Sequence, residues 1–141
     1  MTIKNIILKE DGKTIVFYKH GSSWIAYEQS AYCLWQTGEY IPEVRHMKYL
    51  RKHVVSINFR NALLSEIINS LSAFGLIEMK KDCVQIVLRK KMNKRHFINW
   101  KESIYYRNLK ENVLSFSLET KTSVEAYQFL RKVQQNLSHH L

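Results

Sequence analysis

The sequence predicts an α/β fold, a mixed β-sheet flanked by helices with a C-terminal helical extension. Apolar runs rich in β-branched and aromatic residues alternate with stretches whose apolar residues recur every three or four positions, and beyond Leu88 the chain turns strongly basic. The 141 residues are 45% hydrophobic and carry 22 Lys and Arg against 12 Asp and Glu, a net charge of +10. We expect a core over residues 1–90 and a basic junction with a helical extension over 91–141, packed together as one domain.

Two short apolar runs open the predicted sheet. Residues 15–18 and 24–27 are strands, separated by a polar stretch around Gly21. Residues 28–37 favour a short helix, because apolar side chains recur at spacings of three and four. Gly38 is placed to end this helix in the left-handed conformation.

The second half of the predicted core follows Pro42, which excludes helix locally. Residues 54–57 form a β-branched strand, and residues 83–88 form another. Between them lies the clearest amphipathic helix of the chain, capped by Asn58 or Asn61 and ending at Gly75. Its apolar positions are Leu64, Ile67, Ile68, Leu71 and Phe74. The resulting order of strands and helices is typical of a mixed sheet with helices packed on it.

The C-terminal third is expected to be mainly helical. Phe97, Trp100 and Ile104 share one helical face, and residues 113–118 fit either a strand or a helix. A capping box at residues 122–125 opens a last helix. Its apolar stripe is Val124, Tyr127, Leu130 and Leu137.

No motif in the sequence indicates catalysis, a metal or a cofactor, so we expect a protein that is not an enzyme. His20, His46, His53 and His96 lack metal-ligand spacing, and the isolated glycines form no phosphate-binding loop. The alternative is a metal-dependent nuclease built on Glu78 and Lys80. It would need a second acidic ligand, for which Asp11, Glu66 and Asp82 show no recognisable placement.

Cysteine usage and hydropathy point to a cytoplasmic protein. Cys33 and Cys83 are isolated in sequence and fit a reducing compartment. The N-terminal apolar stretch covers only residues 6–8, which does not fit a signal peptide, and no stretch has the roughly 18 apolar residues of a membrane span. We expect no membrane contact and no small-molecule substrate.

Two basic clusters indicate an anionic polymer as partner, with nucleic acid favoured. The first comprises Arg89, Lys90, Lys91, Lys94 and Arg95, and the second comprises Arg45, His46, Lys48, Arg51, Lys52 and His53. Such cations neutralise phosphates and release counterions. The aromatic residues beyond the first cluster could stack on bases, but their helical spacing favours a place in the core.

Residues 16–31 resemble the opening motif of the N-terminal mismatch-recognition domain of MutS proteins. The resemblance continues through residues 55–60, the helix to Gly75 and the strand at 83–88, and covers residues 13–90. MutS domains carry a Phe-x-Glu reader just after the glycine. Here Ser23 and Ile25 occupy those positions with Trp24 between them, so the resemblance implies the fold without the mismatch wedge.

A small basic domain of this kind is similar to the MutS-like accessory proteins encoded beside reverse transcriptases of diversity-generating retroelements. That resemblance implies an accessory subunit that binds the reverse transcriptase and its template RNA or RNA–cDNA hybrid, with no chemistry of its own. Open alternatives are a protein-interaction adaptor that docks on a polymerase and a protein that binds mismatched or structured DNA.

The predicted site residues fall into two groups. The nucleic-acid-binding group is Lys19, His20, Trp24, Arg45, Lys48, Arg51, Lys52, Arg89, Lys90, Lys91, Lys94, Arg95, Lys101 and Arg107. Within it, Trp24 is either a stacking residue at a turn or part of the core. The protein-interaction group is Tyr127, Phe129, Leu130 and Val133.

Overall fold

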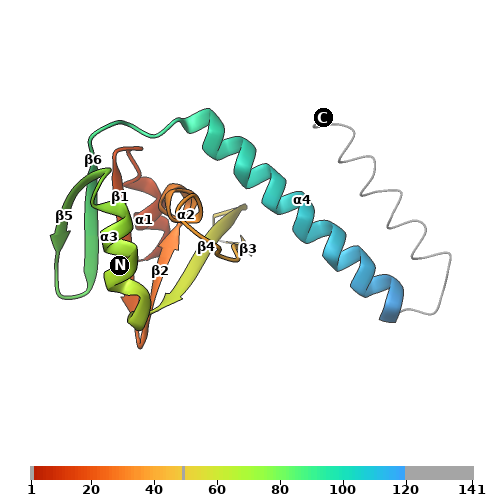
Figure 1. Cartoon of the computed structure of the whole chain (residues 1–141). Coiled ribbons are helices and arrows are strands. Elements are labelled where there is room, and N and C mark those ends of the chain that lie inside the picture. Colours follow the sequence, from red (N-terminus) through yellow and green to blue (C-terminus); the bar gives the residue numbers. More distant parts are fainter. Residues whose placement is uncertain (1, 49, 120–141) are drawn as a thin grey trace. The chain divides into compact units, whose positions relative to one another are not determined.

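The computed structural model describes residues 2–48 and 50–119, with side chains up to residue 111 (Figure 1). The helices are α1 (Ile3–Leu8), α2 (Glu28–Trp35), α3 (Leu64–Leu71) and α4 (Lys94–Glu119), with a 3₁₀ turn at Asn61–Leu63. The strands are β1 (Thr14–His20), β2 (Ser23–Tyr27), β3 (Glu43–Met47), β4 (Lys52–Arg60), β5 (Gly75–Met79) and β6 (Cys83–Leu88). The predicted α/β class is confirmed.

The strands form one sheet in the order β3-β4-β2-β1-β6-β5. All neighbouring strands in it are antiparallel, so the parallel pairs expected of a mixed sheet do not occur among the described residues. Three of the five pairs, β1–β2, β3–β4 and β5–β6, are antiparallel because they are hairpins, while β2–β4 and β1–β6 join strands of different hairpins. Helices α2 and α3 connect these hairpins (Figure 1).

The core lies on the sheet face covered by α2 and α3. Alternate residues of the central strands point to this face, and Ile15, Phe17, Ala26 and Ile86 are at most 1% exposed. Phe17 meets Phe59 edge to face, with ring centroids 5.2 Å apart. The short helix α1 lies over the opposite face, where Ile3 and Ile6 line small cavities with residues of β1 and β2.

Three elements were not predicted: α1, β3 and β5. Both strands lie at the edges of the sheet, where little apolar surface is needed, and Glu43, Arg45 and His46 of β3 are exposed. Gly75 begins β5 and does not cap α3, which ends at Leu71. A Cβ at Gly75 would overlap the carbonyl oxygen of Val87 on β6, so close strand pairing requires glycine there.

The ending predicted for α2 was also wrong. The helix stops at Trp35 with Gln36 as a right-handed C-cap, and Gly38 is not among the glycines with positive φ. Those glycines are Gly12 and Gly21, which lie in turns before β1 and between β1 and β2.

Helix α4 settles the open choice for residues 113–118, which are helical. The predicted face of Phe97, Trp100 and Ile104 is buried. The chain divides into two units, with the second beginning at Glu102, so the start of α4 belongs to the unit of the sheet.

The predicted last helix and the protein-interaction group Tyr127, Phe129, Leu130 and Val133 lie outside the described residues. In the described part of the chain, no helix combines the length and the apolar character needed to span a membrane.

Candidate nucleic-acid interface

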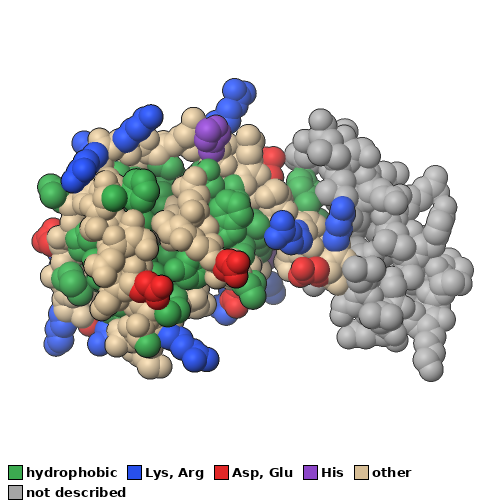
Figure 2. Space-filling model, viewed as in Figure 1, with side chains coloured by type: hydrophobic (Ala, Val, Ile, Leu, Met, Phe, Trp, Pro, Cys, Tyr) green, Lys and Arg blue, Asp and Glu red, His purple; other side chains and the backbone are tan. Residues whose placement is uncertain are grey.

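The two basic clusters lie at the same end of the sheet. Because neighbouring strands run antiparallel, the turn between β3 and β4, the start of β1 and the end of β6 share one end, as the pairs Met47↔Lys52 and Thr14↔Val87 show. The segment after β6 is fixed beside β1 by a hydrogen bond from Met92 N to Gly12 O at 2.8 Å. We call this surface the basic end; its cations, all exposed, are Arg45, Lys48, Arg51, Lys52, Arg89, Lys90, Lys91, Lys94 and Arg95. Figure 2 shows Lys and Arg side chains projecting from the upper rim of the core.

The basic end includes the amino terminus of α4. Asn93 caps this helix, since its Oδ1 accepts a hydrogen bond from His96 N at 3.1 Å. The first turn carries Lys94 and Arg95 and no acidic residue. The helix macrodipole places partial positive charge at this end, so each cation there is unfavourable by about 0.3–1 kcal/mol. A bound anion would remove that repulsion.

The hairpin between β3 and β4 supplies the other part of the basic end. Arg51 adopts a left-handed backbone conformation, with φ 52°, in the turn closed by its own N–H to Lys48 O at 3.2 Å. An arginine there is strained relative to glycine. His46 and His53 face each other across the hairpin with ring centroids 4.9 Å apart. Burial lowers the pKa of His53, and the nearby charges of His46 and Lys101 lower it further.

A buried carboxylate holds α4 against this end of the sheet. Glu28 is 3% exposed and accepts a hydrogen bond from Val55 N at 2.8 Å through Oε1. Its Oε2 forms an ion pair with Lys101 Nζ, also at 2.8 Å. Lys101, predicted to bind nucleic acid, is therefore engaged within the protein, because its ammonium group compensates a buried charge.

A second carboxyl group lies beside this pair. Glu10 Oε1 accepts a hydrogen bond from Gln29 N at 2.9 Å. Burial raises the pKa of Glu10 to about 8, against the lowering effect of that hydrogen bond, and the charge of Glu28 raises it further. Glu10 is thus mostly protonated at neutral pH and does not offset the cations around it.

Trp24 is a core residue. It is 4% exposed, and its indole Nε1 donates to Asn61 Oδ1 at 2.8 Å. Of the two roles left open for Trp24, its burial favours the core, because alternation along β2 turns the side chain to the buried face.

The remaining predicted cations are not gathered at the basic end. Lys19 and His20 are exposed, but they pair with the start of β2 at the opposite end of the sheet. Arg107 is exposed in the second unit.

The aromatic residues of α4 pack in the core, as their spacing predicted. Trp100 lies 5.3 Å from Tyr32 and 5.6 Å from Trp35, measured between ring centroids. Phe97 lies 6.2 Å from Tyr32. These rings form a packing contact between α2 and the start of α4. Tyr32, Phe97 and Trp100 are buried in it and are not available to stack on bases, whereas Trp35 is 38% exposed.

The described residues around Glu78 and Lys80 do not form the metal site that the nuclease alternative needs. Glu78 and Lys80 are exposed at edge strand β5 and the turn after it. Asp11 Oδ1 accepts hydrogen bonds from the backbone N–H groups of Lys13 and Thr14, each at 2.9 Å. Among the described residues, no group of three or more His, Cys, Asp or Glu is placed to hold a metal ion.

Sequence reasoning missed Glu10 and Glu28. Glu10 lies between α1 and β1, and Glu28 directly follows β2; nothing in the local sequence distinguishes either from an exposed charge. Comparison with protein-family models, curated proteins and solved structures finds no match.

Proposed function

We propose that this protein is a non-enzymatic nucleic-acid-binding accessory subunit that contacts phosphates through the basic end. The observation that carries the proposal is that two cationic segments, about forty residues apart in sequence, lie at the same end of the sheet, with β2 and β1 between them. One of them occupies the amino terminus of α4, where cations disfavour the helix unless an anion is present.

The electrostatics of the basic end support a polyanion as the ligand. The nearest buried acids do not neutralise it, because Glu28 is paired with Lys101 and Glu10 is mostly protonated at neutral pH. Exposed cations at fixed spacing bind successive phosphates and release counterions, which makes such binding steeply salt-dependent. Lys and Arg together supply this contact without reading bases.

The partner we propose is RNA or an RNA–DNA hybrid, held together with a reverse transcriptase in the cytoplasm. The sequence resemblance to MutS-like accessory proteins of diversity-generating retroelements supports this setting. A domain without a mismatch wedge is supported by Ser23 and Ile25 at the reader positions, neither of them aromatic, and by Trp24 between them, which is buried and not free to enter a duplex. Two free cysteines, Cys33 and Cys83, fit a reducing compartment.

The test measures the affinity of the purified protein for structured RNA, RNA–DNA hybrid and mismatched duplex DNA. Two variants of equal net charge are compared, R89Q/K90Q/K91Q at the basic end and K19Q/R60Q/K81Q elsewhere on the surface. We expect RNA or hybrid to bind most tightly and only the first variant to lose affinity, by tenfold or more at moderate salt. Equal losses in both variants, or preference for mismatched duplex, would contradict the proposal.

A further inference from the structure

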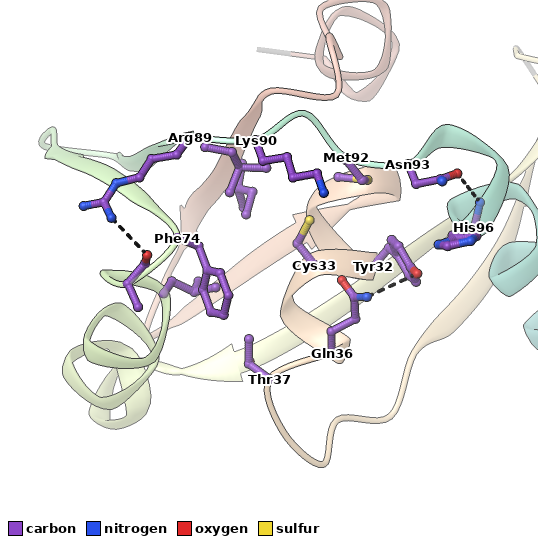
Figure 3. Close-up of a pocket in the computed structure, with 14 residues that line it drawn as sticks. Tyr32, Cys33, Gln36, Thr37, Phe74, Arg89, Lys90, Met92, Asn93 and His96 are labelled. Atoms are coloured by element: carbon purple, nitrogen blue, oxygen red, sulfur yellow. Dashed lines mark hydrogen bonds between the residues drawn. The ribbon is translucent and has the colours of Figure 1, made fainter.

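A pocket of about 440 Å³ lies beside the basic end, between α2, the end of α3 and the segment that joins β6 to α4 (Figure 3). Its volume is within the range of small-ligand sites. Apolar side chains from several elements line it, among them Ile15, Tyr32, Cys33, Leu71, Phe74 and Met92. Arg89, Lys90 and His96 add cationic or titratable groups.

We propose that this pocket receives one unstacked base of a single-stranded nucleic acid while the adjoining phosphates lie on Arg89 and Lys90. The inference rests on the proposed function and adds to it a site that contacts a base. In this proposal the cations bind the phosphate backbone of the nucleic acid, and the pocket behind them binds the base.

Phe74 provides an exposed aromatic surface at this pocket. Phe74 is 57% exposed and also lines the pocket. Its backbone is fixed, because its N–H donates to Leu71 O at 3.0 Å and its carbonyl accepts from Arg89 N at 2.9 Å. An exposed ring on a fixed backbone is suited to stack on a base, a contact that tolerates every base type.

Polar side chains favour a base over an acyl chain as the occupant. Gln36 Nε2 donates to the Tyr32 hydroxyl at 3.2 Å, and Asn93 Oδ1 accepts from His96 N at 3.1 Å. Each amide has a second polar atom that can serve the edge of a base. A lipid tail would leave these groups without partners.

The cations are positioned for the flanking phosphates. Arg89 and Lys90 are exposed and directly precede Lys91 on the segment beside the pocket. Arg89 Nη1 lies 3.4 Å from Ala73 O, which holds the guanidinium near the end of α3. In Figure 3, Lys90 extends along the pocket toward Met92.

The experiment compares two single-stranded oligonucleotides of equal length and charge, one with ordinary bases and one with abasic sites throughout. For the unmodified protein we expect the ordinary oligonucleotide to bind at least about fivefold more tightly. Phe74→Ala and Cys33→Phe should reduce this ratio toward one, the first by removing the stacking surface and the second by filling the pocket. Phe74 is exposed, so its replacement keeps the test valid if Cys33→Phe does not fold.

Two controls separate the outcomes. Leu76→Ala removes another exposed apolar side chain, 73% exposed and outside the pocket lining, and should leave the ratio unchanged. K94Q/R95Q should weaken both oligonucleotides and preserve the ratio. Binding with a ratio of one in the unmodified protein, or a ratio that Phe74→Ala and Cys33→Phe leave intact, would overturn the pocket proposal alone. Absence of binding to either oligonucleotide would overturn it together with the proposed function.

Discussion

Glu28 and Lys101, 73 residues apart in sequence, form an ion pair of 2.8 Å between the start of α2 and the third turn of α4. Glu28 has a positive φ of 50°, which a non-glycine residue adopts only where the surroundings hold it. The same carboxylate accepts a hydrogen bond from Val55 N of β4. One strained, buried residue thus ties two helices to the sheet and positions the amino end of α4 within the basic end.

Replacing Lys101 by Met should lower the free energy of unfolding by about 3 kcal/mol, because it leaves a charged carboxylate buried without its partner. The double variant E28Q/K101M should recover part of this loss, since no buried charge remains. Urea unfolding followed by far-UV circular dichroism measures both. A loss below about 0.5 kcal/mol in the single variant would show that the ion pair contributes little.

The contribution of Glu10 to stability should fall as the pH rises from about 5 to 8. The Glu10 carboxyl titrates near 4.5 in the unfolded chain and near 8 in the folded protein, so between these values the folded state retains a proton that the unfolded state has lost. Glu10→Gln mimics the protonated acid and keeps an acceptor for Gln29 N. Its urea midpoint should exceed that of the unmodified protein at pH 8 and approach it at pH 5; a midpoint difference independent of pH would contradict the assignment.

Arg51→Gly should separate stability from binding. Glycine relieves the left-handed strain and adds entropy to the unfolded chain, so the free energy of unfolding should stay within about 1 kcal/mol. RNA affinity should decrease, because a phosphate-binding cation at the hairpin is lost. Thermal unfolding and fluorescence anisotropy with labelled RNA measure the two effects. Unchanged affinity would remove the hairpin from the interface.

Trp24→Phe should affect stability and leave RNA binding intact. The substitution removes the hydrogen bond from the indole Nε1 to Asn61 Oδ1, which contributes about 1 kcal/mol. Unfolding measurements and RNA titration on the same preparation test this. A loss of affinity without a loss of stability would return Trp24 to the role of a stacking residue.

The elements with strong periodicity could be predicted from the sequence. The strands around residues 15–18, 24–27, 54–57 and 83–88 and the two core helices are present, because each has an apolar pattern that only one structure can bury. The edge strands β3 and β5 were missed, because an edge strand buries little and its stability comes from pairing with a distant neighbour. Gly75 was predicted to end the helix for the same reason. Position 75 requires glycine because a side chain there would collide with Val87 on β6, and this contact is not visible in the local sequence.

The candidate site was predictable as two clusters but not as one surface. Their meeting at one end of the sheet depends on strand order, which neither segment encodes locally. Lys101 shows the same limit, because an exposed cation and a buried ion-pair partner have the same sequence signature until Glu28 is placed beside it.

The salt dependence of RNA binding tests the central claim most directly. The logarithm of the association constant should fall linearly with the logarithm of salt concentration, and R89Q/K90Q/K91Q should make the slope shallower by about 2, as expected for three lost phosphate contacts. The charge-matched variant K19Q/R60Q/K81Q should keep the slope of the unmodified protein. Equal slopes for all three proteins would contradict the assignment of phosphate binding to the basic end.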